Sequence, residues 1–277
     1  MKHQEGHFKG LKDLELYYQA WLPAGDPRAV LLVVHGLAEH SGRYGNVVNF
    51  FVPKGYAVYA PDHRGHGRSG GQRAYVERFT DYLEDLKTFF NMVRGWHPDR
   101  KIFMVGHSMG GTIGLTYALR HQEELDGLAL SGATVRVGES ISPLTVAVGK
   151  LIALLLPKMG TVVLDASAIS RDPAVVAAYD NDPLVFRGKI PARMGAELIR
   201  TMETLPNQVS QLRLPILIMH GTADRLGDPQ GSQWLFDAVG SADKTLKLYE
   251  GYYHEIFNEP EHERVLADVE AWLTAHL

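Results

Sequence analysis

The chain has 277 residues, of which 45% are hydrophobic and 22% charged, which suits one large α/β domain with an insertion. Its formal net charge of −4 argues against nucleic acid as a partner, and the absence of cysteine excludes disulfides, thiolate metal sites and a cysteine nucleophile. The polar opening MKHQEGHFKG lacks the apolar segment of a signal peptide, and no apolar run is long enough to span a bilayer. We therefore expect a cytoplasmic protein.

The predicted elements begin with a weak alternation of polar and apolar residues through LELYYQAWLP, which indicates an edge hairpin. Short runs that are apolar on both faces follow, as expected of strands inside a parallel sheet. These runs occupy residues 29–35, 56–62, 101–107, 125–132, 215–221 and 245–251. Helical patterns separate several of them, for example at 79–96 and 262–277. Strands that alternate with helices predict a doubly wound, mostly parallel α/β sheet.

The alternation breaks between about Val135 and Leu212, where the sequence is rich in helix formers and shows no clear strand. We therefore expect a helical cap inserted after the sixth strand, counting both strands of the hairpin. The predicted core is 1–134 with 206–277, and the predicted cap is 135–205. An insertion after the carboxyl end of such a strand lies over the crevice where ligands bind, so the cap is a candidate lid.

The heptapeptide VGHSMGG places Ser108 between two glycines, after an apolar strand and before a helix. This context is typical of a nucleophile elbow, in which a strained turn exposes the serine hydroxyl. The alternative is that Ser108 merely caps the helix, which serine often does. The strand on one side and the two glycines favour the nucleophile.

A serine nucleophile needs a base and an acid, which follow it in the order acid, then histidine. Asp224 and His254 each come directly after a predicted strand, on the same edge of the sheet as Ser108. Asp228 precedes a proline and suits helix capping better, and His220 ends its strand too early to act as the base. For the oxyanion, we expect backbone N–H donors from Leu37, after the first buried strand, and from Met109.

Six motifs together resemble the monoacylglycerol lipase branch of the α/β-hydrolases, which also includes lysophospholipase-like enzymes. They are HGLAEHSGRY, PDHRGHGRSGG, VGHSMGG, DPLVFRG, GTADRL and YEGYYHEIFNE, and the resemblance runs from about Val30 to the end. It implies an α/β-hydrolase fold with Ser108, Asp224 and His254 as catalytic triad. The implied reaction is hydrolysis of a monoacylglycerol with a medium or long chain to fatty acid and glycerol, through an acyl-enzyme.

The resemblance also bears on the glycerol end of the substrate. Glu39 and Arg43 match family positions near the headgroup, although they could equally form a salt bridge that shapes the loop. Phe257 stands where animal members of the family have a second histidine near the glycerol, so headgroup selectivity is expected to differ.

The cap contains SPLTVAVGKLIALLLPKMG, which predicts a helix that is apolar nearly all round. We expect Val146, Leu151, Leu154 and Leu155 to line the acyl entrance or to contact micelles, giving at most a transient membrane contact. The alternative is that this helix simply packs on the core. No metal-binding or phosphate-binding motif occurs, so we expect no metal and no cofactor.

Three other functions are also compatible with the sequence. A lysophospholipase or a broad carboxylesterase would use the same triad on another lipid or small ester substrate. From a different class, the chain could be a non-catalytic ligand-binding protein on this scaffold.

Overall fold

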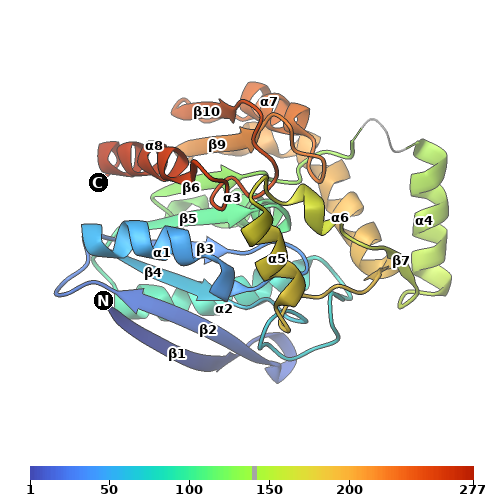
Figure 1. Cartoon of the computed structure of the whole chain (residues 1–277), viewed down its shortest axis with the longest axis horizontal. Helices are drawn as coiled ribbons and strands as arrows, with labels where there is room; N and C mark the ends of the chain where they lie inside the picture. Colours follow the sequence, from blue (N-terminus) through green and yellow to red (C-terminus); the bar gives the residue numbers. More distant parts are fainter. Residues whose placement is uncertain (139–141) are drawn as a thin grey trace.

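An eight-stranded sheet runs through the molecule, with helices on both of its faces (Figure 1). The computed structural model describes residues 1–138 and 142–277. In chain order, the strands of this sheet are β1 (Lys2–Lys9), β2 (Glu15–Leu22), β3 (Ala29–Val34), β4 (Tyr56–Pro61), β5 (Ile102–His107), β6 (Gly127–Ser131), β9 (Ile216–Gly221) and β10 (Lys244–Tyr249). Their spatial order is β1-β2-β4-β3-β5-β6-β9-β10. Strand β2 is antiparallel to both β1 and β4, and all other pairs are parallel, which confirms the predicted fold class.

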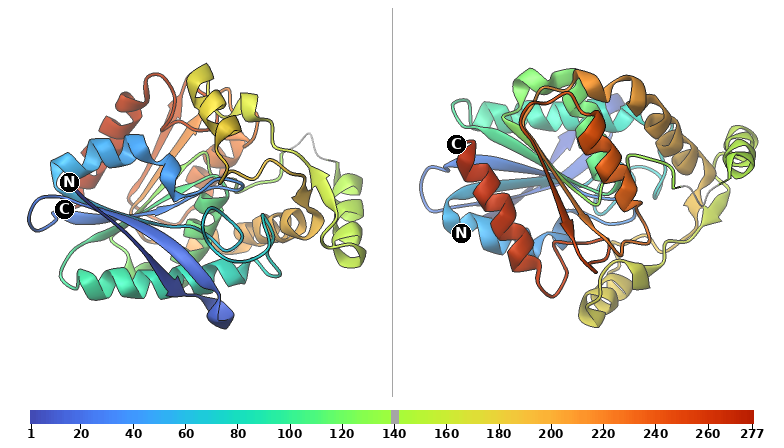
Figure 2. Two further views of the ribbon diagram at one scale, coloured as in Figure 1. Left: turned by 60° about the horizontal axis from the view of Figure 1, so that its bottom comes forward. Right: turned by 90° about the horizontal axis from the view of Figure 1, so that it is seen from above.

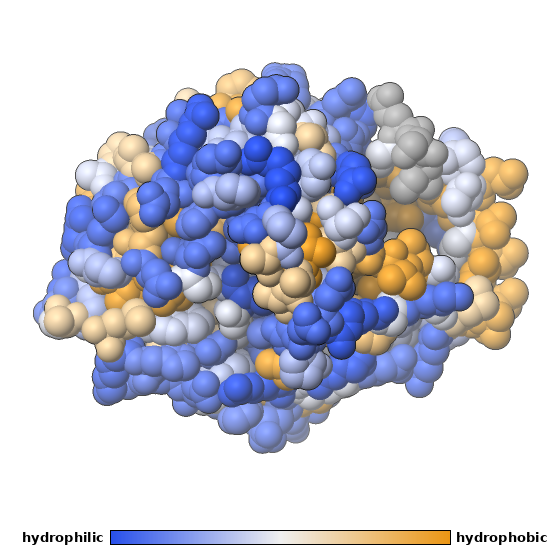
Figure 3. Space-filling model, viewed as in Figure 1, coloured by the Kyte–Doolittle hydropathy of each residue, from blue (hydrophilic) through white to orange (hydrophobic). Residues whose placement is uncertain are grey.

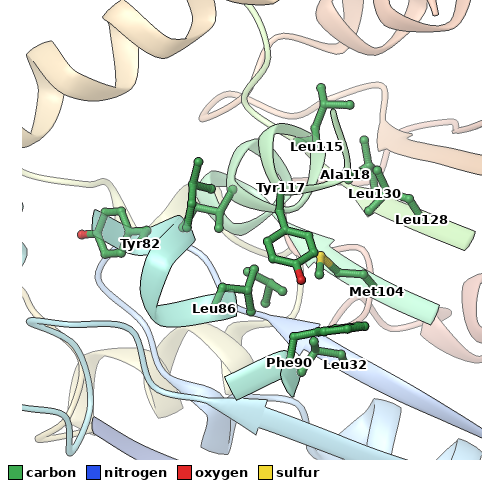
Figure 4. Close-up of a cluster of buried hydrophobic side chains, with 14 of the residues drawn as sticks. Leu32, Tyr82, Leu86, Phe90, Met104, Leu115, Tyr117, Ala118, Leu128 and Leu130 are labelled. Carbon is green, nitrogen blue, oxygen red and sulfur yellow. The ribbon is translucent and has the colours of Figure 1, made fainter. Parts of the chain in front are cut away.

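The central strands bury both faces, because their side chains alternate between two separate hydrophobic cores. In β3, Leu32 faces one core and Leu31 the other. Helices α2 (Thr80–Trp96), α3 (Met109–His121) and α7 (Pro229–Ala238) cover the first core, and α1 (Gly45–Phe51) and α8 (His262–Ala275) cover the second. Figure 4 shows part of the first core, where the rings of Phe90 and Tyr117 lie next to each other, 5.8 Å apart between their centroids. The two helical layers are separated by the sheet in both views of Figure 2.

The predicted edge hairpin is confirmed, since β1 starts at Lys2 and pairs along its whole length with β2. Most side chains of β1 are exposed because the strand lies at the edge of the sheet. Phe8 is the buried side chain of this strand, in the first core, so the apolar alternation along β1 is weak.

Between β6 and β9, the chain forms three further helices, α4 (Pro143–Leu155), α5 (Pro173–Asn181) and α6 (Ala192–Thr204). The expectation that this segment contains no strand is wrong, since β7 (Gly160–Val162) pairs antiparallel with β8 (Ile190–Pro191). Strands of two or three residues are too short to show a periodic pattern. Helix α6 contributes Met194 to the first core, so this end of the insertion is anchored on the sheet domain.

Helix α4 stands at the periphery of the molecule, on the right of Figure 1. It packs through the buried Ala153 against Ala192 and Ala196 of α6, and Lys150 pairs with Glu203. Its other apolar side chains are largely in solvent, with 69% of Leu154 and 68% of Leu155 exposed, and they form the orange edge in Figure 3. The alternative that this helix simply packs on the core is therefore wrong. Among the described residues, no helix is both long and apolar enough to cross a bilayer.

Candidate active site

Ser108 lies in a sharp turn between the end of β5 and the start of α3. Its φ of 54° is strained for a residue with a Cβ atom. The turn is possible because Gly106 and Gly110 leave room for it. A Cβ on Gly106 would lie 2.7 Å from the carbonyl oxygen of Gly110, and one on Gly110 would collide with the carbonyl oxygens of Val34 and His35. The Ser108 side chain makes no capping hydrogen bond to α3, so its hydroxyl is available for other partners.

The hydroxyl of Ser108 instead forms a hydrogen bond with His254, whose Nε2 lies 2.8 Å from the serine Oγ. On the other side of the ring, His254 Nδ1 lies 2.6 Å from Oδ2 of Asp224. These three residues follow β5, β10 and β9 respectively, and the parallel strands bring their carboxyl ends to one edge of the sheet. The structure thus brings together the three residues that the sequence singled out.

The carboxylate of Asp224 is held in one orientation by further donors. Its Oδ1 accepts the backbone N–H groups of Leu226 at 2.7 Å and Gly227 at 2.9 Å. Burial alone raises the pKa of Asp224, but the neighbouring His254 and the hydrogen bonds from His220 and His254 outweigh burial and hold the pKa well below its usual value. Asp224 is therefore ionised at neutral pH and accepts the Nδ1 proton of His254.

His254 is buried, and burial alone lowers its pKa because a buried imidazolium is poorly solvated. The charge of Asp224 and the hydrogen bond to it outweigh burial, so the net effect raises the pKa of His254 above 6.5. The Nδ1–H is committed to Asp224, and the lone pair of neutral Nε2 consequently points at the Ser108 hydroxyl.

The residues expected to supply the two oxyanion donors lie close to this serine. Leu37 and Met109 both line the cavity that contains Ser108, and Met109 begins α3, where backbone N–H groups lack helical partners. The loop after β3 lies directly against the nucleophile, since a Cβ on Gly36 would lie 3.1 Å from the Cβ of Ser108. The side chain of Glu39 accepts the N–H of Gly36 at 2.6 Å and so fixes the start of this loop.

Glu39 and Arg43 belong to a buried ion network rather than to an open headgroup site. Arg43 forms a two-point ion pair with Glu255, lies 3.4 Å from Glu39, and stacks on the ring of Tyr179. Tyr44 also donates to Glu39 at 2.8 Å. Burial raises the pKa of Glu39 in spite of the arginine. The pKa of Glu255 is lowered in spite of burial, because Arg43 bonds to it directly. Their geometry favours the loop-shaping interpretation, although Glu39 also reaches the cavity wall.

Polar and apolar side chains both line the cavity beside Ser108, and the apolar ones predominate. The polar lining includes Ser108, His254, Glu39 and Glu255, and the apolar lining includes Leu37, Met109, Leu164, Ile169, Leu198 and Leu226. Residues of the insertion thus form part of the wall of the cavity that contains the hydrogen-bonded serine.

Five residues that the sequence assigned to substrate binding lie elsewhere. Val146, Leu151, Leu154 and Leu155 are on the peripheral helix α4 and are not part of the cavity wall, because α4 packs on α6 rather than over the serine. Phe257 is only 4% exposed and packs in the second core, beside a small separate cavity next to Glu39. In the structure, Leu164, Ile169 and Leu198 line the cavity instead.

Sequence reasoning missed three residues at this site. The position of His220 at the end of β9 argues against it as the base, but its Nε2 lies 2.9 Å from Oδ2 of Asp224. Glu255 pairs with Arg43, and Asp182 of the insertion bonds His40 at 2.9 Å. Asp182 lies inside the motif DPLVFRG and Glu255 inside YEGYYHEIFNE, which was the available signal for these two residues. The expectation for Asp228 is confirmed, since it caps α7 through the N–H of Gln230.

Among the residues that the structure describes, no group of three or more His, Asp or Glu side chains could hold a metal ion.

The chain is similar to known proteins over its whole length. The family model described as serine aminopeptidase, S33 matches residues 25–261. A monoacylglycerol lipase of Mycolicibacterium smegmatis is 44% identical over 273 residues, which is 99% of this chain and 98% of that protein. The monoglyceride lipase of Mus musculus is 36% identical over 94% of this chain and 86% of its own length. A solved structure of a soluble variant of the Saccharomyces cerevisiae monoglyceride lipase, in complex with a substrate analog, has a TM-score of 0.89 at 27% identity and covers 100% of this chain and 95% of that one.

Proposed function

The chain belongs to the monoacylglycerol-lipase-like α/β-hydrolases, and we propose that it hydrolyses monoacylglycerols of medium to long chain to a fatty acid and glycerol. The observation that carries this proposal is the continuous line of hydrogen bonds from Ser108 through His254 to Asp224, in which Ser108 and His254 line a mainly apolar cavity. The names of the relatives supply the substrate class, and the residues supply the mechanism.

In the proposed first half-reaction, Oγ of Ser108 attacks the ester carbonyl carbon while Nε2 of His254 takes the hydroxyl proton. Asp224 stabilises the imidazolium that forms. The carbonyl oxygen becomes an oxyanion, which the N–H groups of Leu37 and Met109 stabilise. The C–O bond to glycerol then breaks, and His254 returns its proton to the leaving oxygen. The product is an acyl-enzyme on Ser108.

In the second half-reaction, His254 takes a proton from water, and the resulting hydroxide attacks the acyl-enzyme carbonyl. The tetrahedral intermediate uses the same two N–H donors. When it collapses, Ser108 regains its proton from His254 and the fatty acid leaves. One removed oxyanion donor typically lowers kcat by about 10²–10³-fold, so the geometry of the Leu37 loop contributes directly to the rate.

The apolar wall supports an acyl chain as the group that fills the cavity. Each buried methylene contributes about 0.8 kcal/mol, so a longer chain binds more tightly as far as the wall extends. Leu164 and Leu198, which both come from the insertion, line this cavity. We accordingly propose residues 135–205 as a cap that recognises the acyl chain above the core formed by 1–134 and 206–277.

We further propose that α4 contacts lipid aggregates. Leu151, Leu154 and Leu155 are more than half exposed and form one apolar edge of the molecule (Figure 3). Exposed apolar surface of this kind favours a lipid interface, and the contact would be transient in a cytoplasmic protein.

The test compares initial rates on monoacylglycerols from short to long, a diacylglycerol, a triacylglycerol and a lysophospholipid. Wild type should prefer the monoacylglycerols, and Ser108→Ala should abolish turnover. The exposed Ser210→Ala serves as the matched control and should retain the wild-type rate. A preference for the lysophospholipid, or a flat profile over short esters, would replace the proposed substrate with that of a lysophospholipase or broad carboxylesterase. Full turnover in Ser108→Ala would overturn the triad.

A further inference from the structure

A second histidine lies on the carboxylate of Asp224. His220, at the end of β9, is fully buried, and its Nε2 lies 2.9 Å from Oδ2 of Asp224. This is the same oxygen that accepts Nδ1–H of His254 at 2.6 Å. The proposed mechanism does not use His220, because His254 is the residue that reaches Ser108.

The hydrogen bonds around His220 determine which ring nitrogen donates. Asp224 is ionised and can only accept, so Nε2 of His220 must carry the proton that faces it. On the other side of the ring, Nδ1 lies 2.7 Å from Oγ of Ser232 in α7, which is also fully buried. With Nδ1 unprotonated, the Ser232 hydroxyl donates to it and holds the ring in this tautomer.

Asp224 therefore has four donors on two oxygens. Leu226 and Gly227 supply backbone N–H groups to Oδ1, and the two histidines share Oδ2. A carboxylate oxygen that accepts a second hydrogen bond presents less negative charge to the first donor. His220 consequently affects how strongly Asp224 stabilises the imidazolium of His254.

We propose that His220, held by Ser232, is a positioning residue that orients Asp224 and limits the basicity of His254. This inference rests on the proposed function, because it assigns a role within the same triad. Without the donor at His220, Oδ2 of Asp224 would interact with His254 alone. The imidazolium of His254 would then be more stable, and activity would be lost at a higher pH than in the wild type.

Other titratable groups also face His254. His107 on β5 lies 4.8 Å away between ring centroids, Glu255 is its neighbour in sequence, and the charge of Glu39 acts on it from the loop after β3. Substitution of His220 does not remove any of these three groups. If the pH profile shifts only when residue 220 cannot donate a hydrogen bond, the shift is therefore due to the lost contact with Asp224.

The experiment measures the rate at which a fluorophosphonate probe labels Ser108 between about pH 5 and 9, which requires no knowledge of the natural substrate. The acid limb of this profile reports deprotonation of His254. We expect His220→Leu to label about tenfold more slowly at the optimum and to shift the acid limb upward by about half a pH unit. His220→Gln, whose amide can still donate to Asp224, should restore the wild-type limb.

Two further variants keep the test decisive if His220→Leu folds poorly. Ser232→Ala removes only the hydroxyl that holds the tautomer, and it should shift the limb in the same direction by a smaller amount. His97→Gln, a half-buried histidine that bonds Tyr59 outside the site, should leave the limb unchanged. If the acid limb lies at the same pH in wild type, Ser232→Ala and His220→Leu, the inference is overturned. Absence of labelling at Ser108 in the wild type would instead overturn the proposed function.

Discussion

The backbone N–H of Phe186 donates a hydrogen bond to the carbonyl oxygen of Ala38, at 2.8 Å. Phe186 belongs to the insertion, and Ala38 follows Leu37 in the loop that we propose stabilises the oxyanion. Ala38 has a φ of 69°, which is unusual for a residue other than glycine and needs support from its surroundings. A second contact lies nearby, where Asp182 accepts from Nε2 of His40 at 2.9 Å. These two bonds tie the insertion to the loop beside the nucleophile.

The first prediction concerns the side-chain contact of this pair. Asp182→Ala removes the acceptor for His40, and the loop that carries Leu37 should then sample positions in which its N–H no longer faces the oxyanion. We expect kcat on a water-soluble short-chain ester to fall about tenfold, because small displacements of a catalytic donor have large effects on rate. The matched control is the exposed Asp180→Ala, two residues earlier in the same segment. Equal kcat in both variants would show that the contact is only structural.

The second prediction concerns the buried ion network at Arg43. Arg43→Met leaves the carboxylates of Glu39 and Glu255 buried without their counter-ion. Such a loss typically lowers the free energy of unfolding by about 3–5 kcal/mol. Urea denaturation measures this change, and Arg78→Met is the control, since that side chain is exposed and only loosely paired with Asp81 at 4.0 Å. A change below about 1 kcal/mol in Arg43→Met would mean that water reaches the network.

The third prediction concerns the pH dependence of hydrolysis. Neutral His254 is the active base, and its pKa is raised above 6.5 by Asp224. Hence kcat/KM should fall about tenfold per pH unit on the acid side, with a midpoint above the ordinary histidine value. Asp224→Asn removes the charge that raises this pKa, so the midpoint should move to lower pH while kcat falls by roughly 10³–10⁴-fold. A midpoint that stays in place in Asp224→Asn would contradict this assignment of the acid limb.

The fourth prediction concerns the elbow itself. Gly110→Ala places a methyl group against the carbonyl oxygens of Val34 and His35, and backbone atoms cannot move aside as a flexible side chain can. The turn should distort, with a loss of about 2 kcal/mol or more of stability from overpacking and a loss of most activity. A methyl group on Gly95 in α2 would meet no atom within 4 Å, so Gly95→Ala should be neutral or stabilise the helix by up to about 1 kcal/mol. Thermal unfolding and ester hydrolysis of both variants test this contrast.

The sequence predicted the elements with a strong local signal. Strands such as β5 and β9 are apolar on both faces, so a short stretch of sequence is enough to recognise them. The Gly-x-Ser-x-Gly turn then fixes where Ser108 lies. Asp224 and His254 could be selected because each follows such a strand, and parallel strands place those positions at one edge. The sequence therefore allowed the fold and the three residues to be predicted together.

Other features depend on packing between distant segments and have no local signature. The apolar pattern of α4 predicted the helix, but an apolar helix can equally cover a cavity or stand at the periphery, and only its contact with α6 decides between them. Phe257 matches a headgroup position of the family, yet its side chain packs in the second core. The position of His220 in its strand does not indicate a partner, because its contact with Asp224 depends on how the next turn folds back.

Strands β6 and β9 are hydrogen-bonded neighbours, although β6 ends at Ser131 and β9 begins only at Ile216. The whole insertion thus leaves the sheet at the end of β6 and re-enters it at β9, the adjacent strand. No other pair of neighbouring strands in the eight-stranded sheet is connected through it. Evolution can lengthen, shorten or exchange parts of this segment without changing the strand order, provided that its contacts with Ala38, His40 and the loop after β10 are kept. Substrates within such a lineage would then diversify by exchange within one contiguous segment, while these few contacts keep the catalytic loops in place.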